Sequence, residues 1–396
     1  MPHDESRPLA ARRGIPKGVW ALGFVSLFMD ISSEMIHALL PAFLVTVVGA
    51  SALTVGLIEG IAEATASIVK VFSGAISDAL NRRKLLAVIG YGLSALTKPL
   101  FPLATSALPI FGARFIDRIG KGIRGAPRDA LVADLTPPEV RGAAFGLRQS
   151  LDTVGAFCGP LLAILLMSAS GDDFRFVFWV AVIPALIAVV VLVFAVKEPQ
   201  RAAPSRPRSP IHLDELRRLG PAYWRLVIVA SLLTLARFSE AFLLLRVQEL
   251  GLALALLPLA LVIMNLVYSA SAYPVGVLAD RSNPRVLLGL GFCVLIVADL
   301  VLAAAQTWAV ALLGVALWGL HMGMTQGLFA TLVAEIAPAD RRGTAFGLFH
   351  LGNGLALLAA SVIAGALWQQ FGGPATFIAG AIFTVLGLGA AALIRR

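Results

Sequence analysis

The sequence predicts an all-α integral membrane protein with about twelve transmembrane helices in two pseudo-symmetric six-helix bundles. Three observations predict this class. Only 14% of the 396 residues are charged and 58% are hydrophobic, whereas a soluble globular protein carries roughly 25% charged residues. Apolar runs long enough to cross a bilayer recur along the whole chain, and motifs of its first half return in its second half.

The apolar runs form two sets of six. A helix rises about 1.5 Å per residue, so about 20 residues cross a hydrocarbon core about 30 Å thick. We expect the helices near 18–48, 53–78, 85–105, 107–127, 141–168, 174–196, 223–249, 252–279, 286–306, 309–334, 343–370 and 374–394.

The segment between the two sets is rich in Pro, Arg and Ser ("EPQRAAPSRPRSP") and cannot span lipid. It divides the chain into a first bundle (1–196), a cytoplasmic linker (197–222) and a second bundle (223–396). The first 17 residues are polar and basic and show no signal-peptide cleavage pattern, so we expect them to be retained.

Basic residues gather at every second connection between the apolar runs, while most intervening connections carry no charge. This is the positive-inside bias, and it places both termini and the linker in the cytoplasm. It also accounts for the net charge of +9 and the pI of 10.1 without a nucleic-acid partner. The two cysteines, Cys158 and Cys293, lie within spans and indicate neither a disulfide framework nor a metal cluster.

Two sequence motifs occur twice, in the same order. "ALVADLTPPEVRGAAFGL" begins at Ala130 and "TLVAEIAPADRRGTAFGL" at Thr331. "GAISDALNRRK" begins at Gly74 and "GVLADRSNPR" at Gly276. The two pairs have nearly the same offset, so the second half repeats the first.

With these motifs, the chain resembles the major facilitator superfamily over essentially its whole length. The stretch from Gly74 is similar to the family's loop motif between spans two and three, and the stretch from Gly276 to its echo between spans eight and nine. The resemblance implies two parallel halves around a central site, in a transporter that works by alternating access. It also implies a gating latch near the cytoplasmic surface, made by Gly74, Asp78, Arg82, Arg83, Gly276, Asp280 and Arg281.

Span five is similar to the motif of proton-driven antiporters. Gly155, Gly159 and Pro160 in "GLRQSLDTVGAFCGP" fit its spacing, although Leu, Ala and Ile at 162–164 follow where the pattern has two glycines. This resemblance implies proton-coupled export, and the three residues would allow close helix packing.

Ionisable residues lie deep in the first six spans. An ionised group at the bilayer centre costs at least about 2.5–3.5 kcal/mol, so these side chains must face the bundle interior. We expect proton coupling from Asp30, Glu34, Asp117 and Asp152, with i,i+4 ion pairs from Asp117 to Lys121 and from Arg148 to Asp152.

A substrate cavity of mixed charge should lie between the halves. Its candidate residues are Glu59, Glu63, Arg114, Arg118, Arg148, Arg237, Glu240, His321, His350 and Asn353. Either Arg114 or Arg118 could be the arginine that the family often carries in span four. The second half holds fewer deep charges, so we expect ion coupling in the first half and substrate shape in the second.

The predicted function is secondary active transport of a small polar or charged organic solute across the bacterial inner membrane, by proton-coupled export. The alternatives are a proton-coupled uptake symporter and a divalent-metal or siderophore exporter. Asp30, Glu34 and His37 share a helix face and could bind a metal, but a proton site is favoured there.

A membrane enzyme lacks support because no HExxH, GxSxG or phosphate-binding glycine loop occurs. A scaffold would not need the latch. We expect no cofactor, and substrate, protons and lipid as the partners of a monomer.

Overall fold

The computed structural model describes residues 15–80, 82–137, 140–198, 219–336 and 342–393, and these are almost entirely helical. The first bundle contains α1 to α8, and the second contains α10 to α16. The first-bundle helices are α1 (Lys17–His37), α2 (Leu40–Thr46), α3 (Ala52–Leu80), α4 (Arg83–Thr97), α5 (Leu100–Leu103), α6 (Ala107–Leu135), α7 (Arg141–Ser170) and α8 (Phe174–Ala195). Those of the second are α10 (Gly220–Thr234), α11 (Ala241–Glu249), the 3-10 helix η2 (Leu254–Leu256), α12 (Leu259–Arg281), α13 (Pro284–Ala304), α14 (Trp308–Ile336), α15 (Arg342–Phe371) and α16 (Gly373–Leu393).

Each predicted apolar run is occupied by helix. In the described part of the chain, 10 helices are long and apolar enough to cross a membrane. The two predicted runs outside this set are 107–127 and 223–249. The first, in α6, carries several charged residues, and the second is divided between α10 and α11, which have only 15 and 9 residues. The twelve-span count therefore stays a prediction for these two segments.

Two helical spans are broken at corresponding places in the two halves. α1 ends at His37 and α2 begins at Leu40, where Pro41 lacks the amide that would continue the helix. The span of α10 and α11 is broken over 235–240 without a proline. There the hydroxyl of Ser361 accepts from the Ser239 amide at 3.1 Å, and the hydroxyl of Ser239 accepts from the Ala241 amide at 3.2 Å. Side chains thus satisfy two of the backbone donors that the break releases.

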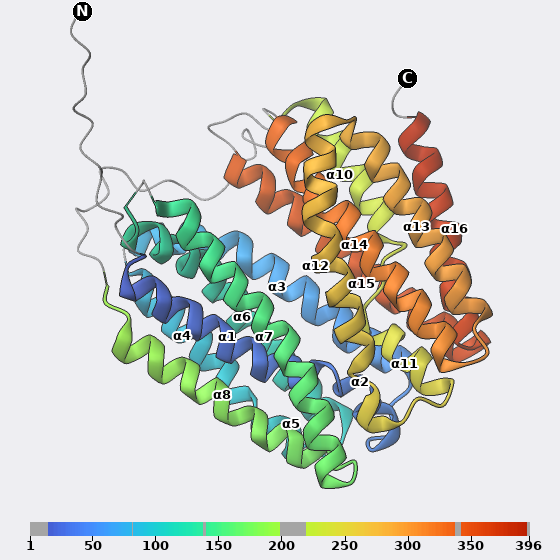
Figure 1. Cartoon of the computed structure of the whole chain (residues 1–396), viewed down its shortest axis with the longest axis horizontal. Coiled ribbons are helices and arrows are strands. Elements are labelled where there is room, and N and C mark those ends of the chain that lie inside the picture. Colours follow the sequence, from blue (N-terminus) through green and yellow to red (C-terminus); the bar gives the residue numbers. More distant parts are fainter. Residues whose placement is uncertain (1–14, 81, 138–139, 199–218, 337–341, 394–396) are drawn as a thin grey trace, which may run out of the picture.

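The two bundles lie side by side and converge toward one end. Figure 1 shows them closest around α2 and α11 and farther apart toward the ends marked N and C. We name these the distal end and the termini end. At the distal end, Leu39 and Phe43 of the first bundle belong to the same buried cluster as Leu243 and Val247 of the second. At the termini end, a separate buried cluster contains only first-bundle residues.

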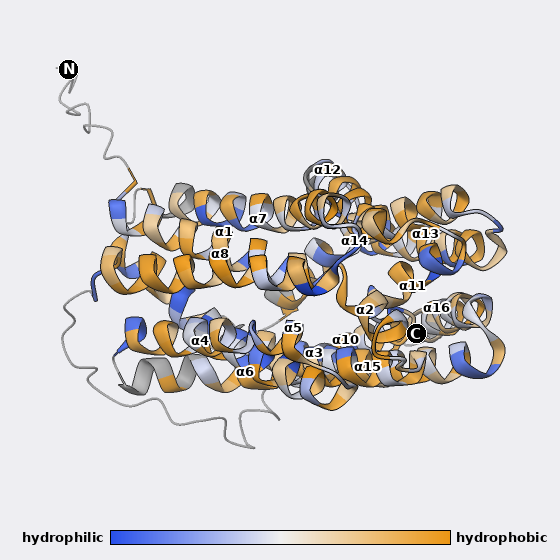
Figure 2. Cartoon of the chain, turned by 90° about the horizontal axis from the view of Figure 1, so that it is seen from below, coloured by the Kyte–Doolittle hydropathy of each residue, from blue (hydrophilic) through white to orange (hydrophobic). Residues whose placement is uncertain are grey.

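Large apolar side chains cover the outside of the molecule. Phe194 is 80% exposed, Leu108 76% and Leu96 73%. Figure 2 shows hydrophobic residues along most of the helices of both bundles. A soluble protein would not present so extensive an apolar surface, whereas lipid would cover it without cost.

Equivalent contacts fix the register between the halves. In the first bundle, a Cβ at Gly90 of α4 would touch Arg124 of α6; in the second, a Cβ at Gly291 of α13 would touch Thr325 of α14. Both residues of the second contact lie 201 positions after those of the first, so α4 and α6 correspond to α13 and α14. In the first two spans the offset is 202, from Gly49 to Gly251, which both have positive φ. Positions in the two bundles can therefore be compared one by one.

Candidate functional site

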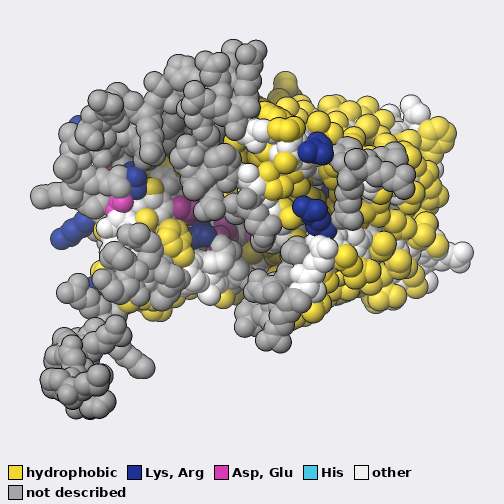
Figure 3. All heavy atoms as spheres, turned by 90° about the horizontal axis from the view of Figure 1, so that it is seen from above, with side chains coloured by type: hydrophobic (Ala, Val, Ile, Leu, Met, Phe, Trp, Pro, Cys, Tyr) yellow, Lys and Arg dark blue, Asp and Glu magenta, His cyan; other side chains and the backbone are white. Residues whose placement is uncertain are grey.

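A cavity of two connected chambers lies between the bundles. The outer chamber, of about 690 Å³, is lined by residues nearer the termini end such as Lys70, Arg128 and Gln149. The inner chamber, of about 430 Å³, is lined deeper in by His37, Glu59 and other residues. The chambers share residues of both bundles: Glu34, Glu63, Ser67, Lys121, Ala156, Asn265 and His350. Seen from the termini end, acidic and basic side chains are visible in the left half of Figure 3, on the side of the first bundle.

Close packing of α6 brings its charged residues to the neighbouring helices. A Cβ at Gly120 would lie 2.6 Å from the Gly90 carbonyl oxygen of α4 and 2.8 Å from the Ser94 hydroxyl. A Cβ at Gly122 would lie 2.6 Å from Cβ of Val69 in α3. Only glycine permits both approaches, so α6 is held tightly against α3 and α4.

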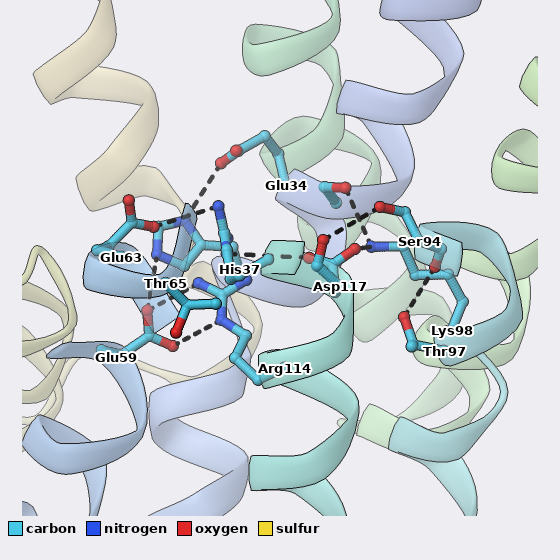
Figure 4. A network of polar contacts seen from close by, with 12 residues as sticks. Glu34, His37, Glu59, Glu63, Thr65, Ser94, Thr97, Lys98, Arg114 and Asp117 are labelled. Carbon is cyan, nitrogen blue, oxygen red and sulfur yellow. Dashed lines mark hydrogen bonds and ion pairs between the residues drawn. The ribbon is translucent and has the colours of Figure 1, made fainter. Parts of the chain in front are cut away.

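The distal side of this charge network joins α1, α3 and α6 (Figure 4). Arg114 donates from Nε and Nη2 to the two carboxylate oxygens of Glu59 at 3.1 and 2.7 Å, and both side chains are almost fully buried. The His37 ring lies between two carboxylates, with Nε2 3.8 Å from Glu59 and Nδ1 3.4 Å from Glu34. The bidentate geometry makes the Arg114–Glu59 pair a strong link between α6 and α3.

A second set of pairs lies one turn further along α6. The Lys98 ammonium is 3.2 Å from the Asp117 carboxylate and 3.0 Å from the Ser33 hydroxyl. Arg118 pairs with Glu63 at 3.2 Å, and its Nε is 3.9 Å from Asp117. Asp117 therefore pairs across helices with Lys98; among the described residues no Asp117–Lys121 ion pair is formed, contrary to the sequence-based expectation.

A third cluster lies on the outer chamber, where α1, α6 and α7 meet. The Asp152 carboxylate is 3.4 Å from Arg148 and 3.7 Å from Arg128, and Asp152 is 22% exposed. Asp30 of α1 lines the same chamber. Two carboxyl groups and two guanidinium groups thus meet at a solvent-accessible wall.

The glycines of span five lie where α7 packs on α1. A Cβ at Gly155 would lie 2.7 Å from the Leu27 carbonyl oxygen, and a Cβ at Gly159 would lie 2.7 Å from Cβ of Glu34. Pro160 is buried within the continuous helix α7. The contact places Asp152 beside Asp30.

The second bundle contributes two charged side chains to the inner chamber, and both lie at the break between α10 and α11. Arg237 and Glu240 line the chamber together with Phe238 and Trp318. Within the described residues neither forms an ion pair, and the buried Arg237 Nε has no hydrogen-bond partner. These charges are available to a bound solute.

A buried acid in α13 was not identified from the sequence. Asp299 is fully buried and accepts from the Trp318 indole at 3.1 Å, while its Oδ2 has no hydrogen-bond partner among the described residues. The signal in the sequence was a lone carboxylate within an apolar run. Trp318 connects this acid to the inner chamber.

Several residues predicted for the cavity lie elsewhere. His321 is fully buried inside the second bundle, with Nδ1 2.8 Å from the Gly291 carbonyl oxygen. Two more residues predicted for the cavity, Arg114 and Arg148, are also buried and line neither described chamber, as is Asp117 of the predicted proton-coupling set. Ion pairs hold all three: Arg114 and Asp117 pair with residues of other helices, and Arg148 pairs with Asp152 of its own helix and Asp129 of α6. The remaining candidates that line a chamber are Asp30, Glu34, Glu59, Glu63, Arg118, Asp152, Arg237, Glu240, His350 and Asn353.

The predicted latch is described only in part. Arg83 pairs with Asp134 at 2.8 Å, and Arg82 is exposed just before α4. The side chains of Asp78, Asp280 and Arg281, and the surroundings of Gly74 and Gly276, lie outside the described part of the structure. Among the described residues, no three His, Cys, Asp or Glu side chains are arranged to hold a metal ion.

Comparison with known proteins identifies the family. The model of the Major Facilitator Superfamily matches residues 22–351 and 241–396. The chain belongs to this superfamily. It is 32% identical over 380 residues to an uncharacterized MFS-type transporter of Methanocaldococcus jannaschii, covering 94% of each chain.

Other relatives are more distant. The multidrug resistance protein MdtH of Photorhabdus laumondii is 31% identical over 162 residues, which is 41% of this chain and 39% of that protein. The fold is similar to that of a bacterial homolog of the human lysosomal transporter Spinster, solved in an inward-facing and unoccupied conformation. The TM-score is 0.78 at 16% identity, covering 94% of this chain and 95% of the other. The protein is thus a multi-pass membrane protein of a transporter family.

Proposed function

We propose that the protein is a proton-coupled secondary transporter that exports a small polar or charged organic solute by alternating access. The observation that carries this proposal is the charged cavity between the bundles, closed at the distal end by Leu39, Phe43, Leu243 and Val247. A solute-sized chamber with solvent-accessible ion pairs is what a transporter requires and what a scaffold does not.

Rocking of the bundles would expose the cavity alternately at its two ends. The helices α3 and α15 pack along most of their length: a Cβ at Gly365 would lie 2.8 Å from the Ala52 carbonyl oxygen, and one at Gly354 would lie 2.7 Å from Cβ of Ser67. This seam can act as the axis, while α7 and α12 separate at the termini end. The positive-inside bias makes that end cytoplasmic, so the conformation is inward-facing. We place the protein in the inner membrane and expect it to act as a monomer.

Proton coupling is assigned to the Asp30–Asp152 pair, with Glu34 nearby on the wall. Both carboxyl groups line the outer chamber, and two carboxyl groups that approach each other can share one proton. Gain or loss of that proton changes the charge that faces Arg128 and Arg148, at 3.7 and 3.4 Å from Asp152. A solute that alters this balance is thermodynamically coupled to the proton, because linkage is reciprocal.

The direction rests on two observations. The span-five motif resembles that of proton-driven antiporters, and MdtH, which matches part of the chain, is a multidrug resistance protein. Proton-coupled uptake is the second candidate, and it is distinguished by the sign of proton movement. Export of a divalent metal or a siderophore is the third.

The test uses full-length protein in liposomes that contain a pH-sensitive dye, with solute pools selected by thermal shift. Asp30→Asn and Asp152→Asn should abolish solute-driven proton movement, while Asp172→Asn, in an exposed connection at the distal end, should retain it. Coupled flux that is undiminished in both cavity variants would remove this pair from the mechanism. Proton movement in the same direction as the solute would replace export by symport.

A further inference from the structure

Most charges at the inner chamber already have partners within the protein. Glu59 pairs with Arg114, Glu63 with Arg118, and Glu34 with His37. Lys121 forms no close ion pair among the described residues, and it lines both chambers together with the carboxylates of Glu34 and Glu63. The first-bundle wall is thus largely balanced before a solute arrives.

The break between α10 and α11 carries two further charges that form no close ion pair among the described residues. Arg237 and Glu240 both line the inner chamber, yet they do not pair with each other. The broken helix matches the break between α1 and α2 in the repeat, and paired breaks in two halves are typical of substrate sites in transporters. A half-buried guanidinium and a half-buried carboxylate that form no close ion pair among the described residues are costly unless a ligand satisfies them.

An apolar surface lies beside these two charges. The rings of Phe238 and Trp318 are 6.0 Å apart and both line the chamber. The chamber therefore offers a cation, an anion and an aromatic wall within about 430 Å³. This volume is at the lower end of the range of small-molecule sites, roughly 300–1,000 Å³.

We propose that the substrate is a small zwitterion, whose carboxylate binds Arg237, whose protonated amine binds Glu240, and whose apolar part packs against Phe238 and Trp318. Arginine is suited to a carboxylate because its donors form a planar fork. The inference rests on the proposed transport function and names the chemical class of its solute.

The test is a set of binding measurements on purified full-length protein with solutes that share a skeleton and differ only in charge. Phenylalanine has both charges, phenylalaninamide only the cation, N-acetylphenylalanine only the anion, and N-acetylphenylalaninamide neither. The same four forms of alanine and of alanylphenylalanine test size. For at least one skeleton, loss of either charge should weaken binding about tenfold or more, as expected for a charge-assisted hydrogen bond.

Variants then assign each charge to its partner. Arg237→Gln should abolish the preference for phenylalanine over phenylalaninamide and keep the preference for a free amine. Glu240→Gln should do the reverse. Arg225→Gln, on the exposed side of α10 and outside both chambers, should leave both preferences unchanged.

Tightest binding of a singly charged or neutral form would overturn the proposal, as would the absence of binding by every zwitterion. Liposome flux separates this outcome from failure of the transport proposal. Flux of another solute class with no zwitterion bound overturns only the substrate class. Zwitterion binding without flux of any solute supports the site and overturns transport.

Discussion

The two bundles share a fold but differ in what holds their helices together. In the first bundle, the bidentate pair of Glu59 and Arg114 joins α3 to α6. At the corresponding positions the second bundle has Leu261 and Val315, which are both buried. The same helix contact is thus made by an ion pair in one half and by apolar packing in the other, so the fold does not require the charge.

A second comparison concerns the next pair of helices. Lys98 and Asp117 form an ion pair at 3.2 Å, and the corresponding residues, Asp299 and Trp318, form a hydrogen bond at 3.1 Å. Here both halves keep a polar link, but the second half has no cation for its acid among the described residues. The two halves therefore keep a polar contact between the same pair of helices but differ in the charge of the residues that make it.

The cavity wall shows the same difference. Asp152 corresponds to Asn353 and Glu63 to Asn265, and all four line the chambers. A carboxamide cannot take up a proton, whereas a carboxylate can. The comparison supports proton coupling in the first half and solute recognition in the second.

The largest expected effect comes from removing one partner of the buried ion pair. Arg114→Val should lower the free energy of unfolding by about 3–5 kcal/mol, because Glu59 would remain as a buried unpaired charge. The double variant Glu59→Leu/Arg114→Val carries the residues of the second bundle and should recover most of this loss. Thermal unfolding in detergent measures the stability of both variants. A single variant as stable as the wild type would show that the ion pair does not hold α3 and α6 together.

An intermediate effect is expected at the acid of the second bundle. Trp318→Phe removes the indole donor and leaves the Asp299 carboxyl without a described partner, which should cost about 1–3 kcal/mol. Asp299→Leu removes the acid and leaves only a neutral indole N–H without its acceptor, so it should cost less. If Asp299→Leu is the more damaging variant in the same unfolding assay, the acid makes a contact that this account lacks.

A third effect, of the same size as the second, tests the close packing of α6. Gly120→Ala would place a methyl group against Gly90 and Ser94 and should cost about 1–3 kcal/mol through overpacking. Gly125 is the matched control, because a Cβ there meets only the Lys70 side chain at 3.9 Å. Gly125→Ala should be neutral or slightly stabilising, since alanine favours helix over glycine. Equal stability of the two variants would contradict the packing argument.

Much of the fold follows from the sequence because hydrophobic length and repetition are local properties. The predicted apolar runs coincide with helices, and the deep charges of the first half do lie inside the bundle. Proline at 41 could have indicated the first helix break, but the break over 235–240 has no such residue. It depends on serine contacts between distant helices, which one sequence does not reveal.

The partners of the charged residues were harder to predict. Spacing along a helix predicted the Arg148–Asp152 pair, which is formed at 3.4 Å. It also predicted Asp117 with Lys121, but Lys98 on α4 is the ion-pair partner of Asp117. The choice depends on the rotation of each helix about its axis. The same rotation turns His321 away from the cavity and into the second bundle.

The most direct test of alternating access is a pair of spin-label distances between the halves. The two native cysteines are first replaced, as Cys158→Ser/Cys293→Ser, so that labels attach only to introduced cysteines. One label pair at positions 85 and 286 reports on the termini end, and another at positions 108 and 310 reports on the distal end. The native residues there, Leu85, Val286, Leu108 and Val310, are at least 44% exposed on the outer surface. Upon addition of solute at an acidic external pH, the first distance should shorten while the second lengthens. Two distances that stay fixed, or that change in the same direction, would contradict the account.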